Sequence, residues 1–218
     1  MRSILFALLF LASTVVSGAN FTSARGVVAQ VLVQTPISAS TGSAVLIAED
    51  TWLSSAHLFT IRGSIEIHTR DGKQEGRLIK IDSKNDLALV QAKASCPCAT
   101  MAAASAVIDE EILAVGFPHG TIVGTQFATT GHSQGVDKGG QLIFSANVAP
   151  GMSGGGIFVF RNNRWELVAI TKAILSIPVN RSTAIPVHWI AYSVPLPTIR
   201  TFLSVPTQNP ASPSLVQP

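Results

Sequence analysis

Three short motifs carry side chains that together could perform nucleophilic catalysis. His57 follows the small residues Ser54-Ser55-Ala56, Asp86 stands at the head of the apolar run Leu87–Val90, and Ser153 lies inside a glycine-rich run. A serine hydroxyl is a weak nucleophile until an imidazole accepts its proton, and an acid on the other ring nitrogen fixes the tautomer of that imidazole. The order His, Asp, Ser therefore predicts a catalytic triad.

Each motif alone has an ordinary structural explanation. A histidine after a strand is commonly an unremarkable residue at the end of a barrel, an aspartate before a strand commonly caps a turn, and a glycine run commonly makes a tight turn. Asp82 also competes with Asp86 for the role of the acid. We prefer Asp86 because it directly precedes Leu87-Ala88-Leu89. Separate structural explanations would need all three motifs to occur in this order by chance, so their joint occurrence favours a catalytic role.

The glycines beside Ser153 predict a second catalytic element. They let the backbone turn sharply, so that main-chain N–H groups converge on the oxyanion that forms during acyl transfer. We expect this oxyanion hole in the run Gly151-Met152-Ser153, with the N–H groups of Gly151 and Ser153 as donors.

A substrate pocket is expected beside Ser153. Its walls should come from the segment that precedes the serine and from a later apolar run, with Lys172 near the rim. Neither segment contains an acid, so we expect small or medium apolar residues before the scissile bond rather than Arg or Lys. The expected lining residues are Asn147, Val148, Ala149, Ala169, Ile170 and Thr171.

The elements that must position these residues are predicted to be strands. Short apolar, β-branched runs alternate with turn signals such as Asp71-Gly72 at a spacing of roughly 8–12 residues, which is typical of an all-β barrel or sandwich. One helix is expected, at 197–203. The expected strands are Val27–Val33, Ser43–Ala48, Ile65–Thr69, Arg77–Ile81, Leu87–Gln91, Ile112–Val115, Leu142–Ala146, Ile157–Phe160 and Leu167–Thr171.

Composition divides the chain further. An apolar run, Ile4–Val16, follows Arg2 and ends in Ser17-Gly18-Ala19, which predicts a cleaved signal peptide over residues 1–19 rather than an uncleaved anchor. We therefore expect an exported protein, secreted or periplasmic, without stable membrane insertion. A first β half is expected over about 20–93, a connector over 94–106, a second half over about 107–196 and a disordered tail over 204–218.

Charge and cysteine content exclude several functions. Only 12% of residues are charged and 47% are hydrophobic, which argues against disorder. The net charge of +3 comes from scattered residues, which argues against nucleic-acid binding. The pair Cys96 and Cys98 predicts two loop thiols or a local bridge rather than a metal site, so no metal is expected.

These motifs resemble those of trypsin-like serine proteases, most closely the HtrA-type branch. The strand Gly42–Ile47 leading to Ser55-Ala56-His57, the segment Asp82 to Asp86-Leu87-Ala88-Leu89, and the run Pro150–Gly155 are each similar to family motifs. So are Val115–Gly120, Thr129-Thr130-Gly131 and the closing segment Ala191–Leu203. The resemblance implies an all-β fold of two packed six-stranded antiparallel β-barrels with a short C-terminal helix. It also implies an endopeptidase of polypeptides that uses the triad His57, Asp86 and Ser153 and needs no cofactor.

The chain also departs from the family pattern. Met152 replaces the usual Asn or Asp before the nucleophile, Gly156 replaces a common Pro, and no PDZ domain follows. A protease-fold binding module with impaired catalysis is therefore the alternative function. An α/β-hydrolase is disfavoured because no Asp follows Ser153 and helical patterns are nearly absent. Asn20–Arg25 is short for the N-terminal segment of a trimer, so a monomer is expected.

Overall fold

The computed structural model describes residues 20–118, 124–180 and 183–205. The predicted signal peptide, residues 1–19, and all but the first two residues of the predicted disordered tail lie outside the described residues. Within the described part, no helix is long and apolar enough to cross a membrane.

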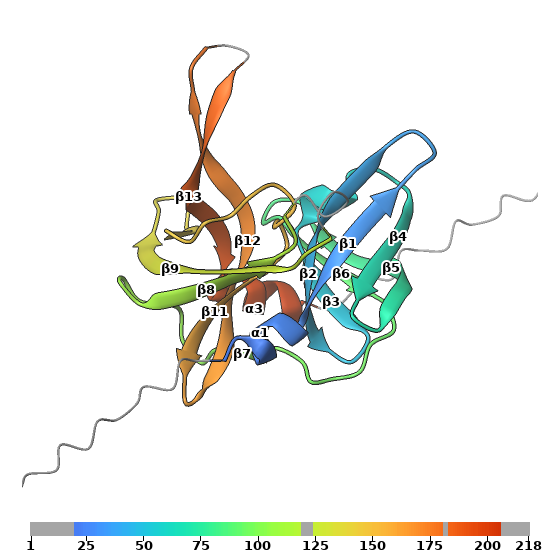
Figure 1. The fold of residues 1–218 in the computed structure, drawn as a ribbon, viewed down its shortest axis with the longest axis horizontal. Coiled ribbons are helices and arrows are strands. Elements are labelled where there is room, and N and C mark those ends of the chain that lie inside the picture. Colours follow the sequence, from blue (N-terminus) through green and yellow to red (C-terminus); the bar gives the residue numbers. More distant parts are fainter. Residues whose placement is uncertain (1–19, 119–123, 181–182, 206–218) are drawn as a thin grey trace, which may run out of the picture.

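The first half of the chain forms a closed six-stranded antiparallel barrel (Figure 1). Its strands pair in the order β1-β2-β3-β6-β5-β4, and a short helix α1 (Thr22–Gly26) precedes them. A single 3₁₀ turn, η1 (Ala56–Phe59), follows β3. The strands are β1 (Val28–Gln34), β2 (Ala39–Ala48), β3 (Thr51–Ser54), β4 (Ser64–Thr69), β5 (Gly72–Asp82) and β6 (Leu87–Gln91).

The second half forms another ring of six strands. The order is β11-β8-β9-β10-β13-β12, and a β11–β12 pairing closes it. The two-residue β7 (Thr100–Met101) lies parallel to β12 outside the ring, and α3 (Leu196–Ser204) follows the last strand. The strands are β8 (Glu111–Gly116), β9 (Phe127–Val136), β10 (Leu142–Phe144), β11 (Gly156–Arg161), β12 (Arg164–Pro178) and β13 (Ala184–Pro195). The predicted two-barrel fold and C-terminal helix are confirmed.

Three apolar cores hold the two barrels together. One fills each barrel, and the third lies between them and includes side chains from both barrels and from α3. Successive residues of a strand point to opposite faces, so a strand at this interface is buried on both sides. In β6, Leu87 and Leu89 face the other barrel, whereas Ala88 and Val90 face the inside of their own. These doubly buried strands explain why the sequence has long apolar runs and few charges.

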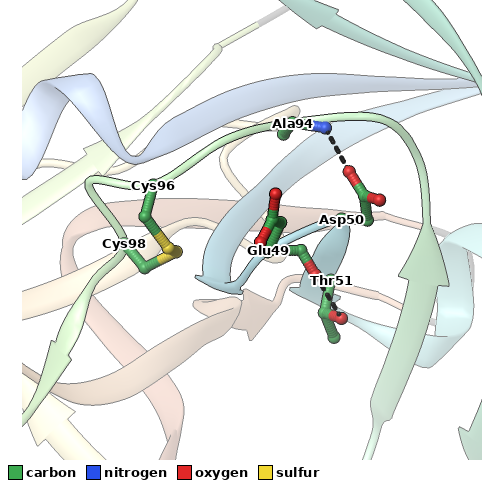
Figure 2. The surroundings of a disulfide bond; sticks show 6 residues. All are labelled: Glu49, Asp50, Thr51, Ala94, Cys96 and Cys98. Carbon is green, nitrogen blue, oxygen red and sulfur yellow. Dashed lines mark hydrogen bonds between the residues drawn. A yellow bond between two sulfur atoms is a disulfide. The ribbon is translucent and has the colours of Figure 1, made fainter.

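The connector between the barrels contains a disulfide between Cys96 and Cys98 (Figure 2). The sequence predicted either two loop thiols or a local bridge, and the structure contains the bridge. There is no free cysteine among the described residues. Asp50 holds the start of the connector, because its carboxylate accepts the N–H of Ala94 at 2.7 Å. No group of three or more potential metal ligands is present in the described ranges.

Candidate active site

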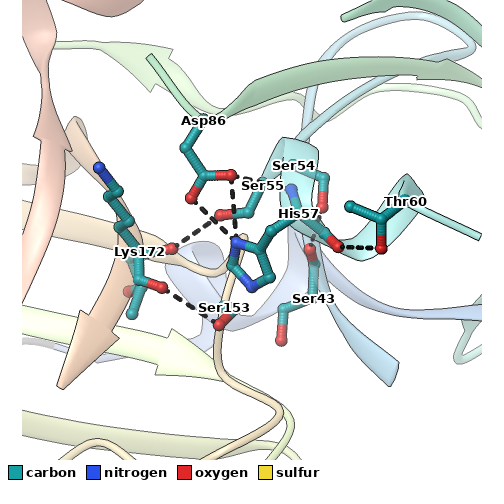
Figure 3. A network of polar contacts seen from close by, with 9 residues as sticks. Ser43, Ser54, Ser55, His57, Thr60, Asp86, Ser153 and Lys172 are labelled. Atoms are coloured by element: carbon teal, nitrogen blue, oxygen red, sulfur yellow. Dashed lines mark hydrogen bonds and ion pairs between the residues drawn. The ribbon is translucent and has the colours of Figure 1, made fainter. Parts of the chain in front are cut away.

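The structure places His57 and Asp86 in direct contact. Nδ1 of His57 lies 2.9 Å from Oδ2 and 3.1 Å from Oδ1 of Asp86, and the His57 main-chain N–H donates to Oδ1 at 2.9 Å (Figure 3). His57 belongs to η1 directly after β3, and Asp86 adopts a positive φ of 59° directly before β6. β3 and β6 are neighbouring strands, so their ends bring the two side chains together.

The contact defines the state of the imidazole. A neutral imidazole that donates through Nδ1 to a carboxylate leaves Nε2 as the hydrogen-bond acceptor, so the contact selects this tautomer of the neutral ring. The Asp86 side chain is 9% exposed whereas that of His57 is 45% exposed. The acid is therefore enclosed, while the ring opens towards solvent on its other side, as a general base needs.

Asp82 has a different role from Asp86. Its carboxylate accepts the main-chain N–H groups of Lys84 and Asn85, both at 3.1 Å, and the Asn85 amide at 2.6 Å. Partial burial raises the pKa of Asp82, but these hydrogen bonds outweigh that effect and hold the pKa below its ordinary value. Asp82 caps the turn that leads to Asp86.

Ser153 comes from the second barrel, yet β2 of the first barrel holds its main chain. Its carbonyl accepts the N–H of Ser43 at 2.8 Å, and Gly154 N–H donates to the carbonyl of Thr171 at 2.8 Å. Gly154 has a φ of +83°, and a Cβ there would lie 2.1 Å from the carbonyl oxygen of Ser43. Glycine at 154 therefore allows the serine loop to approach the first barrel closely.

The Ser153 hydroxyl lies on the side of the imidazole ring away from Asp86 (Figure 3). In this structure the hydroxyl donates to the carbonyl of Lys172 at 3.3 Å. No hydrogen bond joins this hydroxyl to the His57 ring in the described structure. Three residues that are far apart in the sequence are thus brought to one point between the barrels.

The loop before Ser153 presents main-chain donors. Met152 N–H donates to the carbonyl of Ala149 at 3.0 Å, whereas the N–H groups of Gly151 and Ser153 have no acceptor within the described part of the chain. The Met152 side chain is buried in the core of the second barrel, so it contributes only main chain to the loop. The two unpaired N–H groups are the donors expected for an oxyanion.

Gly156 has a packing role that the sequence did not indicate. A Cβ at this position would lie 2.4 Å from the ring of Phe158, a fully buried side chain in the core between the barrels. Glycine at 156 therefore leaves room for that ring.

A cavity of about 240 Å³ lies beside Ser153. Of the six expected lining residues, Val148, Ala149 and Thr171 line it; Asn147 does not, and Ala169 and Ile170 are buried in the cores. Successive strand residues face opposite sides, so residue types alone did not identify which ones reach the cavity. No acidic side chain lines it. The other lining residues are Pro150, Ser153, Lys172, Ala173 and Ile174.

The sequence matches a family model, described as the trypsin-like peptidase domain, over residues 42–170. This span is more than half of the chain and contains His57, Asp86 and Ser153. The chain therefore belongs to the trypsin-like peptidase domain family. No curated protein matches the chain at a significant level.

Solved structures with the same fold include several proteases. The chain is 19% identical to the serine endoprotease from Yersinia pestis, with a TM-score of 0.71. The match covers 84% of this chain and 65% of that one. It is 17% identical to a protease from M. tuberculosis in its active form, with a TM-score of 0.71 and coverage of 88% of this chain and 86% of that one. It is 24% identical to the HtrA-type protease AlgW with tripeptide, with a TM-score of 0.68. The match covers 85% of this chain and 62% of that one.

These similarities establish the two-barrel protease fold. They agree with the HtrA-type resemblance of the motifs. The chain spans less than two thirds of the length of the Yersinia pestis and AlgW structures, so its activity is argued from its own residues.

Proposed function

We propose that this protein is a serine endopeptidase that uses His57, Asp86 and Ser153. The observation that carries the proposal is the hydrogen-bonded pair His57–Asp86, with the Ser153 hydroxyl on the other side of the same imidazole ring. The two unpaired N–H groups of Gly151 and Ser153 supply the donors for the negative charge that develops.

In the first step, Oγ of Ser153 forms a bond to the carbonyl carbon of the substrate as Nε2 of His57 accepts the hydroxyl proton. The C–N bond then breaks, and His57 gives that proton to the leaving amine. In the second step, water attacks the acyl carbon as His57 accepts a proton from it. The ester C–O bond to Ser153 then breaks and releases the carboxylic acid product, while His57 returns the proton to Oγ of Ser153. Asp86 stabilises the imidazolium in both steps without itself becoming protonated.

The substrate is a polypeptide whose residue before the scissile bond is small or medium and apolar. The cavity beside Ser153 is bordered by Val148, Ala149 and Ala173 and has no acidic lining residue. A cationic side chain would therefore find no counter-charge in it. A cleavage profile over a peptide library tests this preference, and predominant cleavage after Arg or Lys would contradict it.

We place the protein in an exported compartment. The supporting observations are the apolar run Ile4–Val16 with its small-residue ending, and the Cys96–Cys98 disulfide, since disulfides persist mainly in oxidising compartments.

Labelling with a fluorophosphonate probe tests the catalytic proposal, because such probes react with activated serines. We expect the full chain to be labelled, and the Ser153→Ala and His57→Ala variants to show less than about one hundredth of that labelling. Asp71→Asn is the matched control, since Asp71 is exposed in the turn between β4 and β5 and does not hold any triad residue. An unlabelled wild type that circular dichroism shows to be folded would instead establish a binding module with impaired catalysis.

A further inference from the structure

A cavity of about 840 Å³ lies beside the first barrel, outside the candidate active site. It is bordered by the end of α1, by β1, by the turn after β4 and by the stretch after β6, and Phe117 and residues 124–126 close it from the second barrel. Gln126 ties the two sides together, because its amide donates to the carbonyls of Arg25 at 2.8 Å and Val28 at 2.9 Å. The volume is in the range of pockets that hold small-molecule ligands.

Gln30 of β1 lines this cavity with an amide that lacks a partner. Ala29 and Val31, on either side of it, face the inside of the first barrel, so Gln30 points outwards. The residue is only 8% exposed, yet its side-chain amide makes no hydrogen bond to any residue that the structure describes. Because nearly all enclosed polar groups in proteins have a partner, this amide indicates a polar ligand in the cavity.

Three cations from separate segments line the same cavity. Arg25 comes from α1, Arg70 from the turn between β4 and β5, and Lys93 from the stretch after β6. None of the three pairs with a carboxylate in the described ranges, and Asp71 is the one acidic side chain among the described lining residues. These cations are scattered in the sequence, and only the fold brings them together.

The charge of the lining suits a doubly charged anion. Three cations and one carboxylate give it a formal charge of +2. His68 also lines the cavity, but its Nε2 lies 2.8 Å from a carboxylate oxygen of Glu66. A phosphate monoester carries close to −2 at neutral pH, and guanidinium groups bind its oxygens bidentately. Leu46, Trp52 and Phe117 add apolar surface to the same cavity.

We propose that this cavity binds a free organic phosphate monoester. Its phosphate group is held by Arg25, Arg70 and Lys93, with the Gln30 amide donating to one oxygen, and its apolar part packs against Phe117. A single small molecule suits the site better than a lipid surface, because the Gln30 amide is enclosed rather than on an open face. The inference goes beyond the proposed function and does not depend on catalysis.

Isothermal titration calorimetry of the full chain with phenyl phosphate tests the proposal. Inorganic phosphate and phenyl sulfate are the comparison ligands, since the first lacks the apolar part and the second carries a single negative charge. At about pH 7.5 we expect phenyl phosphate to bind about tenfold more tightly than either. In an amide NMR spectrum, phenyl phosphate should shift the side-chain signal of Gln30 but not that of Gln91, which lies outside the cavity.

A charge variant tests the cations. Arg70→Gln combined with Lys93→Gln should weaken the binding of phenyl phosphate at least about tenfold, because two of the three cations are lost. Both side chains are exposed and make no ion pair with a described residue, so the variant should keep its fold. Arg62→Gln is the matched control, an exposed arginine of the same barrel outside the cavity, and should leave binding unchanged.

Gln30→Met tests the amide, since it keeps the approximate length and volume of the side chain. We expect phenyl phosphate to bind about fivefold more weakly. The urea midpoint should be no lower than that of the wild type, because within the described chain the amide has no partner to lose. A lower midpoint together with unchanged binding would show that the amide is satisfied inside the protein, against the proposal.

Equal binding of phenyl phosphate by the wild type and the Arg70/Lys93 double variant would overturn the proposal. So would sedimentation with phosphatidylcholine–phosphatidic acid vesicles that the double variant loses, if phenyl phosphate does not bind, because the cations would then serve a lipid surface. Failure of the catalytic proposal is distinguishable: it appears as absent fluorophosphonate labelling of a protein that still binds phenyl phosphate, and Ser153→Ala should leave that binding unchanged.

Discussion

At the scale of single residues, Ser43 connects the first barrel to the loop that carries the candidate nucleophile. Its hydroxyl donates to the carbonyl of Gly151 at 3.0 Å and accepts the N–H of Phe117 at 2.9 Å. Its own N–H donates to the carbonyl of Ser153 at 2.8 Å. Ser43 is fully buried, so its three contacts fix the orientation of the main chain on both sides of Met152.

Ser43→Ala should therefore impair catalysis without preventing folding. Without the hydroxyl, the carbonyl of Gly151 loses its donor, and the unpaired N–H groups nearby lose their fixed direction. We expect kcat to fall about tenfold with little change in KM, because an oxyanion hole acts mainly in the transition state. Steady-state kinetics on a cleaved peptide measures both constants.

The matched control is Ser54→Ala. The Ser54 hydroxyl is also buried and donates to the carbonyl of Ser43 at 2.7 Å, but it makes no hydrogen bond to the nucleophile loop, which it meets only by packing against Gly154. Both variants should lose about 1 kcal/mol of unfolding free energy, which denaturant titration measures. An equal fall of kcat in both variants would assign the effect of Ser43 to general stability.

The triad candidates could be found from the sequence because each lies in a local motif next to a strand end. His57, Asp86 and Ser153 needed only residue order and immediate neighbours. The lining of the cavity depends instead on which face of β12 each residue occupies, and Ala169 and Ile170 prove to face the cores. Ser43 was visible only as part of a strand motif, since its partners lie more than seventy residues away.

At the scale of elements, one ion pair fastens the connector to the second barrel. Arg161, at the end of β11, donates to both carboxylate oxygens of Glu110, at 2.7 and 2.6 Å, and also to the carbonyls of Ala104 and Ser105. Partial burial raises the pKa of Glu110, but the Arg161 guanidinium and the Val107 N–H outweigh it and hold the pKa below its ordinary value.

Arg161→Met should therefore destabilise the protein in a pH-dependent way. Four acceptor atoms lose their donor, and we expect a loss of about 2 kcal/mol at pH 7. Because folding lowers the pKa of Glu110, the pair stabilises the native state above the ordinary carboxyl pKa and loses this effect as pH falls through the lowered value. The difference between wild type and variant should shrink below about pH 4.

Urea titrations between pH 7 and pH 3 measure this difference. Lys73→Met is the control, since Lys73 pairs with Glu66 at the surface, and solvent screens such pairs. We expect a much smaller change for it at pH 7. A loss for Arg161→Met that is constant across this pH range would show that Glu110 does not contribute.

The elements themselves differed in how well the sequence revealed them. All nine predicted strands overlap observed ones, because their apolar runs mark buried faces. β9 was missing from that set: its sequence Phe127–Val136 is largely polar and has only one buried residue, so it has no apolar periodicity to detect. β13 contains prolines, which ordinarily argue against a strand, and Pro186 is accommodated opposite Ser176 of β12.

At the scale of the whole molecule, the N-terminal segment of the described chain packs against its own second barrel. Phe21 contacts the ring of Trp165 at a centroid distance of 5.6 Å, and the Trp165 indole donates to the carbonyl of Asn20 at 3.2 Å. Ala24 of α1 is buried in the core between the barrels. The N-terminal segment is therefore packed against its own chain rather than left free to contact a second one.

We expect the mature protein to begin at Asn20 and to be a monomer. Intact-mass analysis of the protein purified from cells that express the full chain gives its first residue, and size-exclusion chromatography with light scattering gives its assembly state. A mass three times that of one chain would contradict the monomer, and Phe21→Ala would then show whether the N-terminal segment is the contact, since the trimer would weaken in that variant.

The two barrels each contribute a part of the candidate catalytic group, the acid and base from one and the nucleophile from the other. A chain in which only one barrel has formed thus lacks part of this candidate group. The group is complete only when the two barrels are docked, with Ser43 against the loop around Ser153. Under the proposed function, dividing the site between the barrels keeps a partly folded chain from digesting itself or its neighbours.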